Sequence, residues 1–536
     1  MRWHRRLTLW MVLGALSWLA PTAAETRYHQ HCAKAKGSQG AVKVLAATYL
    51  GGKGAEELIA AGWAPNGDIL AVGNAWGPEF PDEPTPIVVG EDRFTPAQVL
   101  ADPEKLRLDY RNPNIAGFVA RSSPDLSRLV SVTRFGWGMA MAGSALVARD
   151  GAVYLSGRCS PEARRLAEAA GLTRHTVSAP ADVETSGADL YLARLSPGVE
   201  LPDWVVIFEA AEGWSSHWER RMGNANHLGI RLGERSDGSL ALVAFNRLYT
   251  LTQDGATLEQ VSSTRGGVLL MVDPSDDSVY LGGDENTNTG REPWRRPFLT
   301  KYDRAGEVVW EGWRWNSRTV GEDKYRLVSD SGVYGVTLSG DDEEFVWGWS
   351  DGGNSVFSRQ PRSLDQPVPM KGSFIDSLWG ANVGKFSWLM RLDREKRQVL
   401  QGGNWCSFRV DKNKPNSSAI SDAVVLDDGR IAFVGSSSWA FVETPDAWVR
   451  TFPEGSGGTY FAVLSEDLRD LLFASLLPSC GGPVRLATRG TQALIACRAN
   501  PPAENMPSLL VNAVQADFGG LVDGYLLLAD TASEAE

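Results

Sequence analysis

The residues best suited to ligand chemistry in this chain are its tryptophans, of which the sequence contains 20. An indole ring has a large flat apolar face, which can stack on a sugar ring or wedge two sheets together. Trp313 and Trp315 are two positions apart, so a strand would carry both on one side. Trp214 and Trp218 form a second close pair. These four residues are a candidate sugar-binding platform, with packing between sheets as the alternative.

A second group of residues has the oxygen-rich chemistry that a hard cation prefers. Asp284, Glu285, Asn286 and Asn288 follow Gly283 in a segment that we expect to be a loop. Carboxylate and amide oxygens in loops coordinate Ca²⁺, although this spacing is not that of an EF-hand. The segment is a candidate calcium site, with a solvated acidic turn as the alternative. The sequence indicates no other cofactor.

The cysteines suggest one disulfide. The chain has five cysteines, and this odd number leaves at least one thiol unbridged. Cys480 lies in a Gly-rich turn and Cys497 ends a strand of the same expected sheet, so we predict a bridge between them. Cys159 or Cys406 should stay reduced. No Cys-x-x-Cys pair occurs in the sequence, which argues against a zinc site built from thiolates.

The elements that must position these residues are short strands, and two signatures recur along the chain. The first is a short aromatic or aliphatic strand, and the second is a turn followed by an alternating run. The first signature occurs at Gly117–Arg121, Leu190–Arg194, Arg247–Leu251, Pro297–Lys301, Ser387–Arg391, Thr459–Val463 and Gly524–Leu528. The second occurs at Asp68–Gly73, Asp150–Leu155, Asp237–Leu242, Asp276–Gly282, Gly332–Val336, Asp428–Gly435 and Thr491–Ile495.

Seven copies of each signature predict an all-β fold, a β-propeller with seven blades of antiparallel strands. The clearest unit runs from Thr48 to Gly73, and we expect it to form one sheet. The unit over residues 297–385 is longer than the others, so a ring of eight blades is the alternative. The first strand, Val42–Thr48, and the last strand, Gly524–Leu528, should pair. Such pairing would complete the first blade and close the ring, because it removes an open sheet edge.

The N-terminus is typical of a secretory signal peptide. A start that contains Arg2, Arg5 and Arg6 precedes an apolar run, and Thr22–Ala24 supplies small residues for cleavage. The expected organisation is a signal peptide over 1–24, a leader over 25–41, a single propeller domain over 42–530 with rim insertions near 76–115 and 159–187, and a tail over 531–536.

The charge balance restricts the partners. The formal net charge is −12, which argues against nucleic acid and against anionic membrane surfaces. No later apolar run approaches membrane-spanning length. We expect a monomer that is secreted, periplasmic or displayed on the cell surface.

Two segments resemble known propeller motifs. Thr48–Gly52 (TYLGG) and Gly73–Pro81 (GNAWGPEFP) resemble the repeat of the secreted bacterial β-propeller repeat (SBBP) family, although Glu79 stands where that family prefers Asp. The resemblance implies a surface or periplasmic propeller and carries no established activity or catalytic residues. Trp349–Ser355 partly resembles the Asp-box of sialidase-type propellers, in which the Asp stabilises its own turn.

These observations favour a non-catalytic propeller that acts as a binding or interaction scaffold for a protein or a glycan. The alternative is a glycan-active hydrolase or lyase on the same scaffold. Acids, arginines and tyrosines that converge at one end of the central channel would favour the enzyme, whereas small and apolar residues would favour the scaffold. The sequence assigns no catalytic residue.

Overall fold

A computed structural model describes most of the region predicted to form the propeller. The described residues are 42–76, 80, 84–89, 116–135, 141–159, 161–180, 189–197, 202–210, 230–264, 267–287, 290–340, 342–370, 385–409, 414–439, 443–449, 456–477, 480–501 and 509–532. The predicted signal peptide and leader lie outside them, as does most of the predicted insertion at 76–115. In the described residues no helix is long and apolar enough to cross a membrane.

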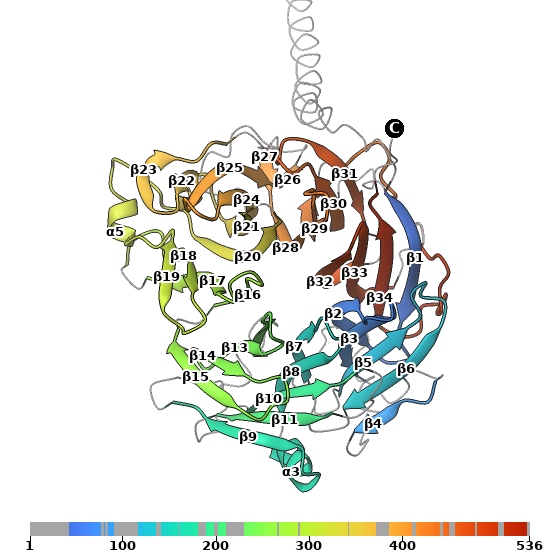
Figure 1. Cartoon of the computed structure of the whole chain (residues 1–536). Coiled ribbons are helices and arrows are strands. Elements are labelled where there is room, and N and C mark those ends of the chain that lie inside the picture. The colour runs from blue at the N-terminus through green and yellow to red at the C-terminus, as the bar shows by residue number, and fades with distance from the viewer. Residues whose placement is uncertain are drawn as a thin grey trace, which may run out of the picture.

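The described strands form seven antiparallel blades around an axis, which confirms the predicted propeller (Figure 1). Blade one contains β2 (Glu56–Trp63), β3 (Ile69–Ala75), β5 (Ala116–Ser122) and β6 (Leu129–Phe135). Blade two contains β7 (Met141–Val147), β8 (Val153–Cys159), β10 (Asp189–Leu195) and β11 (Trp204–Glu209). Blade three contains β12 (Arg231–Glu234), β13 (Leu240–Ala244), β14 (Arg247–Leu251) and β15 (Leu258–Ser263).

Blades four to seven follow the same order from the axis outward. They contain β16 (Leu269–Val272), β17 (Val279–Asn286), β18 (Arg295–Tyr302) and β19 (Val308–Gly312); β20 (Ser331–Ser339), β21 (Glu343–Ser350), β24 (Phe386–Asp393) and β25 (Gln398–Trp405); β28 (Ser418–Val425), β29 (Ile431–Trp439), β30 (Ser456–Leu464) and β31 (Leu471–Leu476); and β32 (Cys480–Arg489), β33 (Gln492–Ala499), β34 (Asp523–Asp530) and β1 (Lys43–Leu50).

The ring closes in the seventh blade through the pairing that the sequence predicts. β1 is antiparallel to β34, with Ala46 opposite Leu528 and Tyr49 opposite Tyr525. The predicted unit from Thr48 to Gly73 is not one sheet, however. Thr48 lies in the outermost strand of blade seven, whereas Gly73 lies in β3 of blade one. The sequence repeat is therefore offset from the structural blade, and β1 completes the last blade rather than the first.

The long unit over residues 297–385, which left an eighth blade open, contributes its described blade strands to blades four and five. Val308–Gly312 is β19, the outer strand of blade four. Gly332–Val336 lies in β20, the innermost strand of blade five, and not in a second strand as predicted. The second strand is β21, whose Trp347 lies opposite Leu389 of β24. Within the described residues the ring has seven blades.

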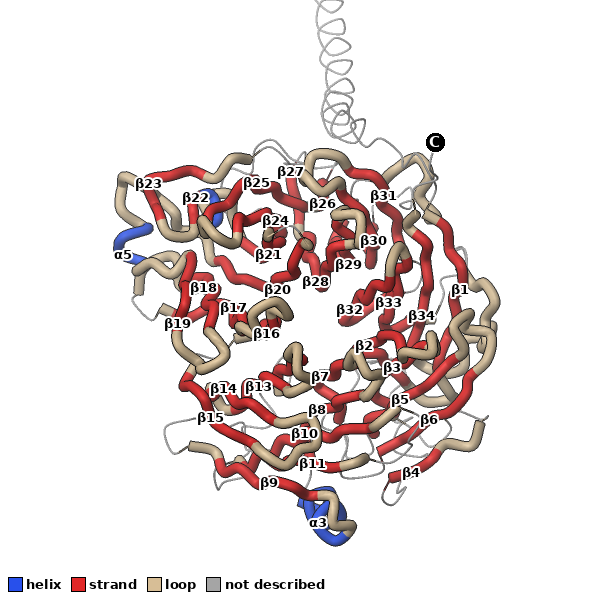
Figure 2. Tube along the Cα trace, in the orientation of Figure 1, coloured by secondary structure: helices blue, strands red, loops and turns tan. Residues whose placement is uncertain are grey.

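The two faces of the ring differ in how the strands are joined. Short turns link first to second strands and third to fourth strands, and we call this side the turn face. The opposite side, the insertion face, carries the links from second to third strands and from each blade to the next. Every additional element arises from these links: β4 (Ile87–Val89), α3 (Pro161–Ala169), β9 (Thr173–Ser178), α5 (Ser317–Val320), β22 (Arg359–Gln360), β23 (Ser363–Pro367), β26 (Ser407–Arg409) and β27 (Lys414–Asn416) (Figure 2).

Candidate functional site

The insertion face carries an open cavity of about 630 Å³ between blades four and five, which we call the insertion-face recess. Residues of the β17–β18 hairpin line one side, and residues around β20, β21 and the start of β24 line the other. The lining residues are Asn286, Gly290, Trp294, Arg295, Asp330, Trp349, Asp351 and Lys385.

Trp294 is the aromatic residue that this recess offers to solvent. Its exposed fraction is 57 %, although large apolar side chains are normally buried. The backbone around it is fixed, because Thr287 N–H donates to the Trp294 carbonyl at 2.8 Å. The Arg295 N–H donates to Oδ1 of Asp330 at 2.9 Å, which ties the hairpin to blade five. These two backbone hydrogen bonds therefore hold the ring at the surface.

Charged groups of both signs line the recess together with Trp294. Burial, and then the negative charge of Asp330, raise the pKa of Asp351. Lys385 Nζ lies 4.2 Å from the ring centre of Trp349, which is itself buried. In such a recess the exposed ring can stack on a sugar, while the carboxylates accept hydrogen bonds from its hydroxyls and the ammonium group donates to them.

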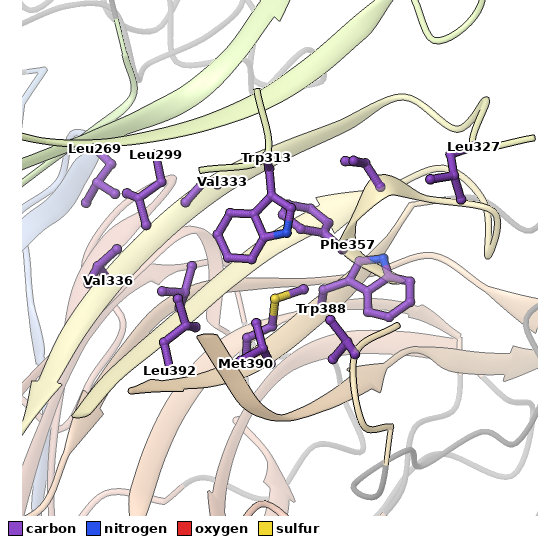
Figure 3. Close-up of a cluster of buried hydrophobic side chains, with 14 of the residues drawn as sticks. Leu269, Leu299, Trp313, Leu327, Val333, Val336, Phe357, Trp388, Met390 and Leu392 are labelled. Carbon is purple, nitrogen blue, oxygen red and sulfur yellow. The ribbon is translucent and has the colours of Figure 1, made fainter. Parts of the chain in front are cut away.

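The predicted platform at Trp313 and Trp315 is not accessible in the way that the sequence suggested. Trp313 is completely buried, its Nε1–H donates to the Arg359 carbonyl at 3.1 Å, and its ring meets Phe357 edge to face (Figure 3). Trp315 is half-buried against the same cluster. Both follow the end of β19, and Trp313 has a φ of 57°, so strand alternation does not apply to them. Trp313 therefore has the packing role that the sequence analysis gave as the alternative to a sugar platform.

The predicted calcium ligands lie in a strand and not in a loop. Asp284, Glu285 and Asn286 end β17 and pair with β18. Successive strand side chains point to opposite faces, so these three cannot converge on one ion. Glu285 lies 2.8 Å from Nη2 of Arg296, and Asp284 lies 3.8 Å from Nη1 of Arg295. Asn286 lines the recess.

Three predicted site residues, Trp214, Trp218 and Asn288, lie outside the described residues. The structure joins Cys480 and Cys497 in a disulfide, with their Cα atoms 5.9 Å apart.

Of the recess residues, only Asn286 was a predicted site residue, and Trp349 and Asp351 were predicted only as part of an Asp-box-like turn. Sequence reasoning did not single out Trp294, Arg295, Asp330 or Lys385. A signal was available for Trp294, because it follows Pro293 in the polar gap between two predicted strands. An aromatic residue placed in a turn has no sheet to pack against. The other three residues meet only through contacts between blades, which the sequence does not display.

Comparisons with known proteins give no closer identification. No family model matches the chain, and no curated protein matches it. Among solved structures, the chain is similar to a protein of unknown function from Dyadobacter fermentans, with 9 % identity and a TM-score of 0.42 over 92 % of this chain and 99 % of that one.

Two further structures cover 85 % of the chain. One is an ulvan lyase described as a new polysaccharide lyase family, with 10 % identity, a TM-score of 0.37 and 92 % of its own chain covered. The other is the β-propeller domain of the Trilobed protease from Pyrococcus furiosus, with 9 % identity, a TM-score of 0.36 and 90 % coverage. At these identities the likeness concerns the fold alone. The chain is a β-propeller of seven blades.

Proposed function

We propose that this protein is a non-catalytic propeller that acts outside the cytoplasm, at the cell surface or in the periplasm, and binds a saccharide in the insertion-face recess. The observation that carries the proposal is the exposed ring of Trp294 beside Asp330, Asp351 and Lys385. Stacking supplies affinity for any sugar with an apolar ring face, and the charged groups select hydroxyl positions. The protein would act as a monomer.

The test is a screen of the mature protein on a saccharide array, followed by calorimetric titration of the best ligand. Trp294→Ala should weaken binding about tenfold, because it removes the stacking face. Val308→Ala is the matched control, since Val308 is 58 % exposed on β19, outside the recess lining. If Trp294→Ala binds as tightly as the unaltered protein, the recess is not the saccharide site.

A glycan-active hydrolase is the second candidate, and the observation that favours it is the raised pKa of Asp351 beside Asp330. Hydrolysis of a glycosidic bond generally uses one protonated and one ionised carboxyl group. Incubation with the ligands from the screen would release shorter products if this candidate is correct. Asp351→Asn would then abolish release, whereas intact saccharides after long incubation support binding alone.

A further inference from the structure

A second cavity, of about 610 Å³, lies on the axis of the ring, and we call it the axial cavity. Its wall comes from the inner strands β2, β7, β12, β28 and β32. Of these, β2, β7, β28 and β32 are labelled beside the central opening in Figure 1. The cavity reaches the turn face, where Pro65 of the first turn lies in its wall. Most of the wall is small or apolar. Its charged residues are Arg149, Arg231, Asp422, Arg485 and Arg489.

Arg231, the first residue of β12, is an uncompensated cation in this cavity. Among the described residues its guanidinium has no hydrogen bond and no ion pair. Burial, and then the charge of Arg485, lower the pKa of Arg231 to about 10. Arg485 forms one hydrogen bond among the described residues, in which its Nε–H donates to the Ile59 carbonyl at 3.3 Å. Two positive charges therefore share the cavity.

Asp422 does not neutralise both arginines. Its Oδ1 accepts from the Ala423 N–H and its Oδ2 from the Leu486 N–H, each at 3.0 Å. Within the described residues neither Arg231 nor Arg485 forms an ion pair with it. Burial raises the pKa of Asp422, and the positive charge of Arg485 acts in the opposite direction. At least one positive charge in the cavity thus lacks a partner.

Arg231 and Arg485 are half-buried. A cation that is partly removed from water without a counter-charge is costly, and guanidinium forms forked hydrogen bonds to planar or tetrahedral oxyanions. We propose that the axial cavity binds a small molecule through an oxyanion group, a carboxylate, sulfate or phosphate, with Arg231 and Arg485 as its hydrogen-bond donors. This site is separate from the insertion-face recess and does not depend on saccharide binding there.

The mouth of the cavity suits the entry of an anion. Arg149 and Arg489 lie in the wall near the turn face, while the protein as a whole carries a net charge of −12. Glu234 Oε2 lies 3.4 Å from Nε of Arg149 and offsets part of that charge. Positive charges gathered in a recess with low-dielectric walls raise the local concentration of anions.

The experiment is calorimetric titration of the mature protein with sodium phosphate, sodium sulfate and sodium glucuronate at pH 7 and low ionic strength. We expect at least one to bind, and which one identifies the oxyanion. Arg231→Gln should weaken that binding by about tenfold or more, as expected for loss of a charge-assisted pair. Arg485→Gln should have a similar effect. Arg469→Gln is the control, because Arg469 is exposed on the turn face and pairs with Asp467.

A thermal melt without ligand separates binding from a structural role. Because the Arg231 side chain has no partner among the described residues, Arg231→Gln should melt at the same temperature as the unaltered protein or higher. The proposal is overturned if none of the three anions binds, or if Arg231→Gln and Arg485→Gln bind as tightly as the control. A lower melting temperature of Arg231→Gln without ligand, together with unchanged anion affinity, would also overturn it.

Discussion

Two carboxyl groups are buried together where β1 leads into β2. A Cβ atom built on Gly51 would clash with Oδ1 of Asp523 and would lie 2.9 Å from Oε2 of Glu56, so both acids approach one point. Both side chains are completely buried, and Glu56 Oε1 and Asp523 Oδ1 have no hydrogen-bond partner among the described residues. Burial is the main cause that raises the pKa of Glu56 to about 8 and that of Asp523 to about 6.

This pair predicts a loss of stability as the pH rises. The unfolded chain releases the Glu56 proton near its ordinary pKa of 4.5, whereas the folded chain keeps it until about pH 8. Between these two pH values the folded state binds more protons, so the free energy of unfolding falls by about 1.4 kcal/mol for each unit that the pH rises. We expect the melting temperature to fall between pH 5 and pH 8, and to fall less in Glu56→Gln.

The control for this pH series is Glu259→Gln, because Glu259 is exposed on β15. Its melting profile should follow that of the unaltered protein at every pH. Identical slopes for all three proteins would mean that Glu56 ionises in the folded state as it does in the unfolded one.

At the scale of the strands, an ion pair recurs between the third strand of a blade and the turn that precedes its second strand. Arg121 Nε lies 2.5 Å from Asp68, Arg194 Nη2 lies 3.1 Å from Asp150, and Lys301 Nζ lies 2.9 Å from Asp276. Arg391 pairs with Glu343 in the same position of blade five. Four of the seven copies of the first sequence signature end in a basic residue, and in each of these four it pairs with an acid at or just before the start of the second strand.

Strand β34 is the element on which closure depends. Tyr525, Leu526, Leu527 and Leu528 are all almost completely buried between β33 and β1 and between neighbouring blades. A chain that ends at Val522 should aggregate or unfold at a markedly lower temperature, because burial of each lost side chain contributes roughly 1.5–3 kcal/mol to the free energy of unfolding. Circular dichroism melts and light scattering would show this.

The matched truncation removes only residues 533–536, beyond the last strand, and should leave the melting temperature unchanged. An unchanged melting temperature for the chain that ends at Val522 would mean that β34 contributes nothing to the ring.

The strands of the fold were largely predictable because their signal is local. All seven copies of the first signature are third strands, and six of the seven copies of the second are second strands. Gly332–Val336 was misplaced because turn residues show that a strand follows, but not which strand of a blade it is. The recess was not predictable, since Trp294 and Lys385 meet only after blades four and five are placed side by side.

At the scale of the whole molecule, the two faces of the ring differ in structure. All additional elements among the described residues arise on the insertion face, while the turn face consists of short turns with recurring ion pairs. Loops on a rigid scaffold can change in sequence and length at little cost to the core. The insertion-face recess therefore lies where new specificity is easiest to build, whereas the wall of the axial cavity is formed mainly by the inner strands.

The predicted route of this molecule out of the cytoplasm has its own test. Cleavage after Ala24 should leave Glu25 as the first residue of the exported protein. Edman sequencing of periplasmic or secreted material checks this. Met1 intact on a cytoplasmic protein would contradict export.

The place of β1 at the outer edge of blade seven also dictates an order of events during biosynthesis. β1 is the first described strand to be made, and its partner β34 is the last. Domains begin to fold as their chains emerge, yet β1 must wait with an open hydrogen-bonding edge until almost the whole protein has been translated. Chaperones that shield strand edges should be needed most in that interval. A chain whose translation stops before β34 lacks the partner of β1, so its ring should not close.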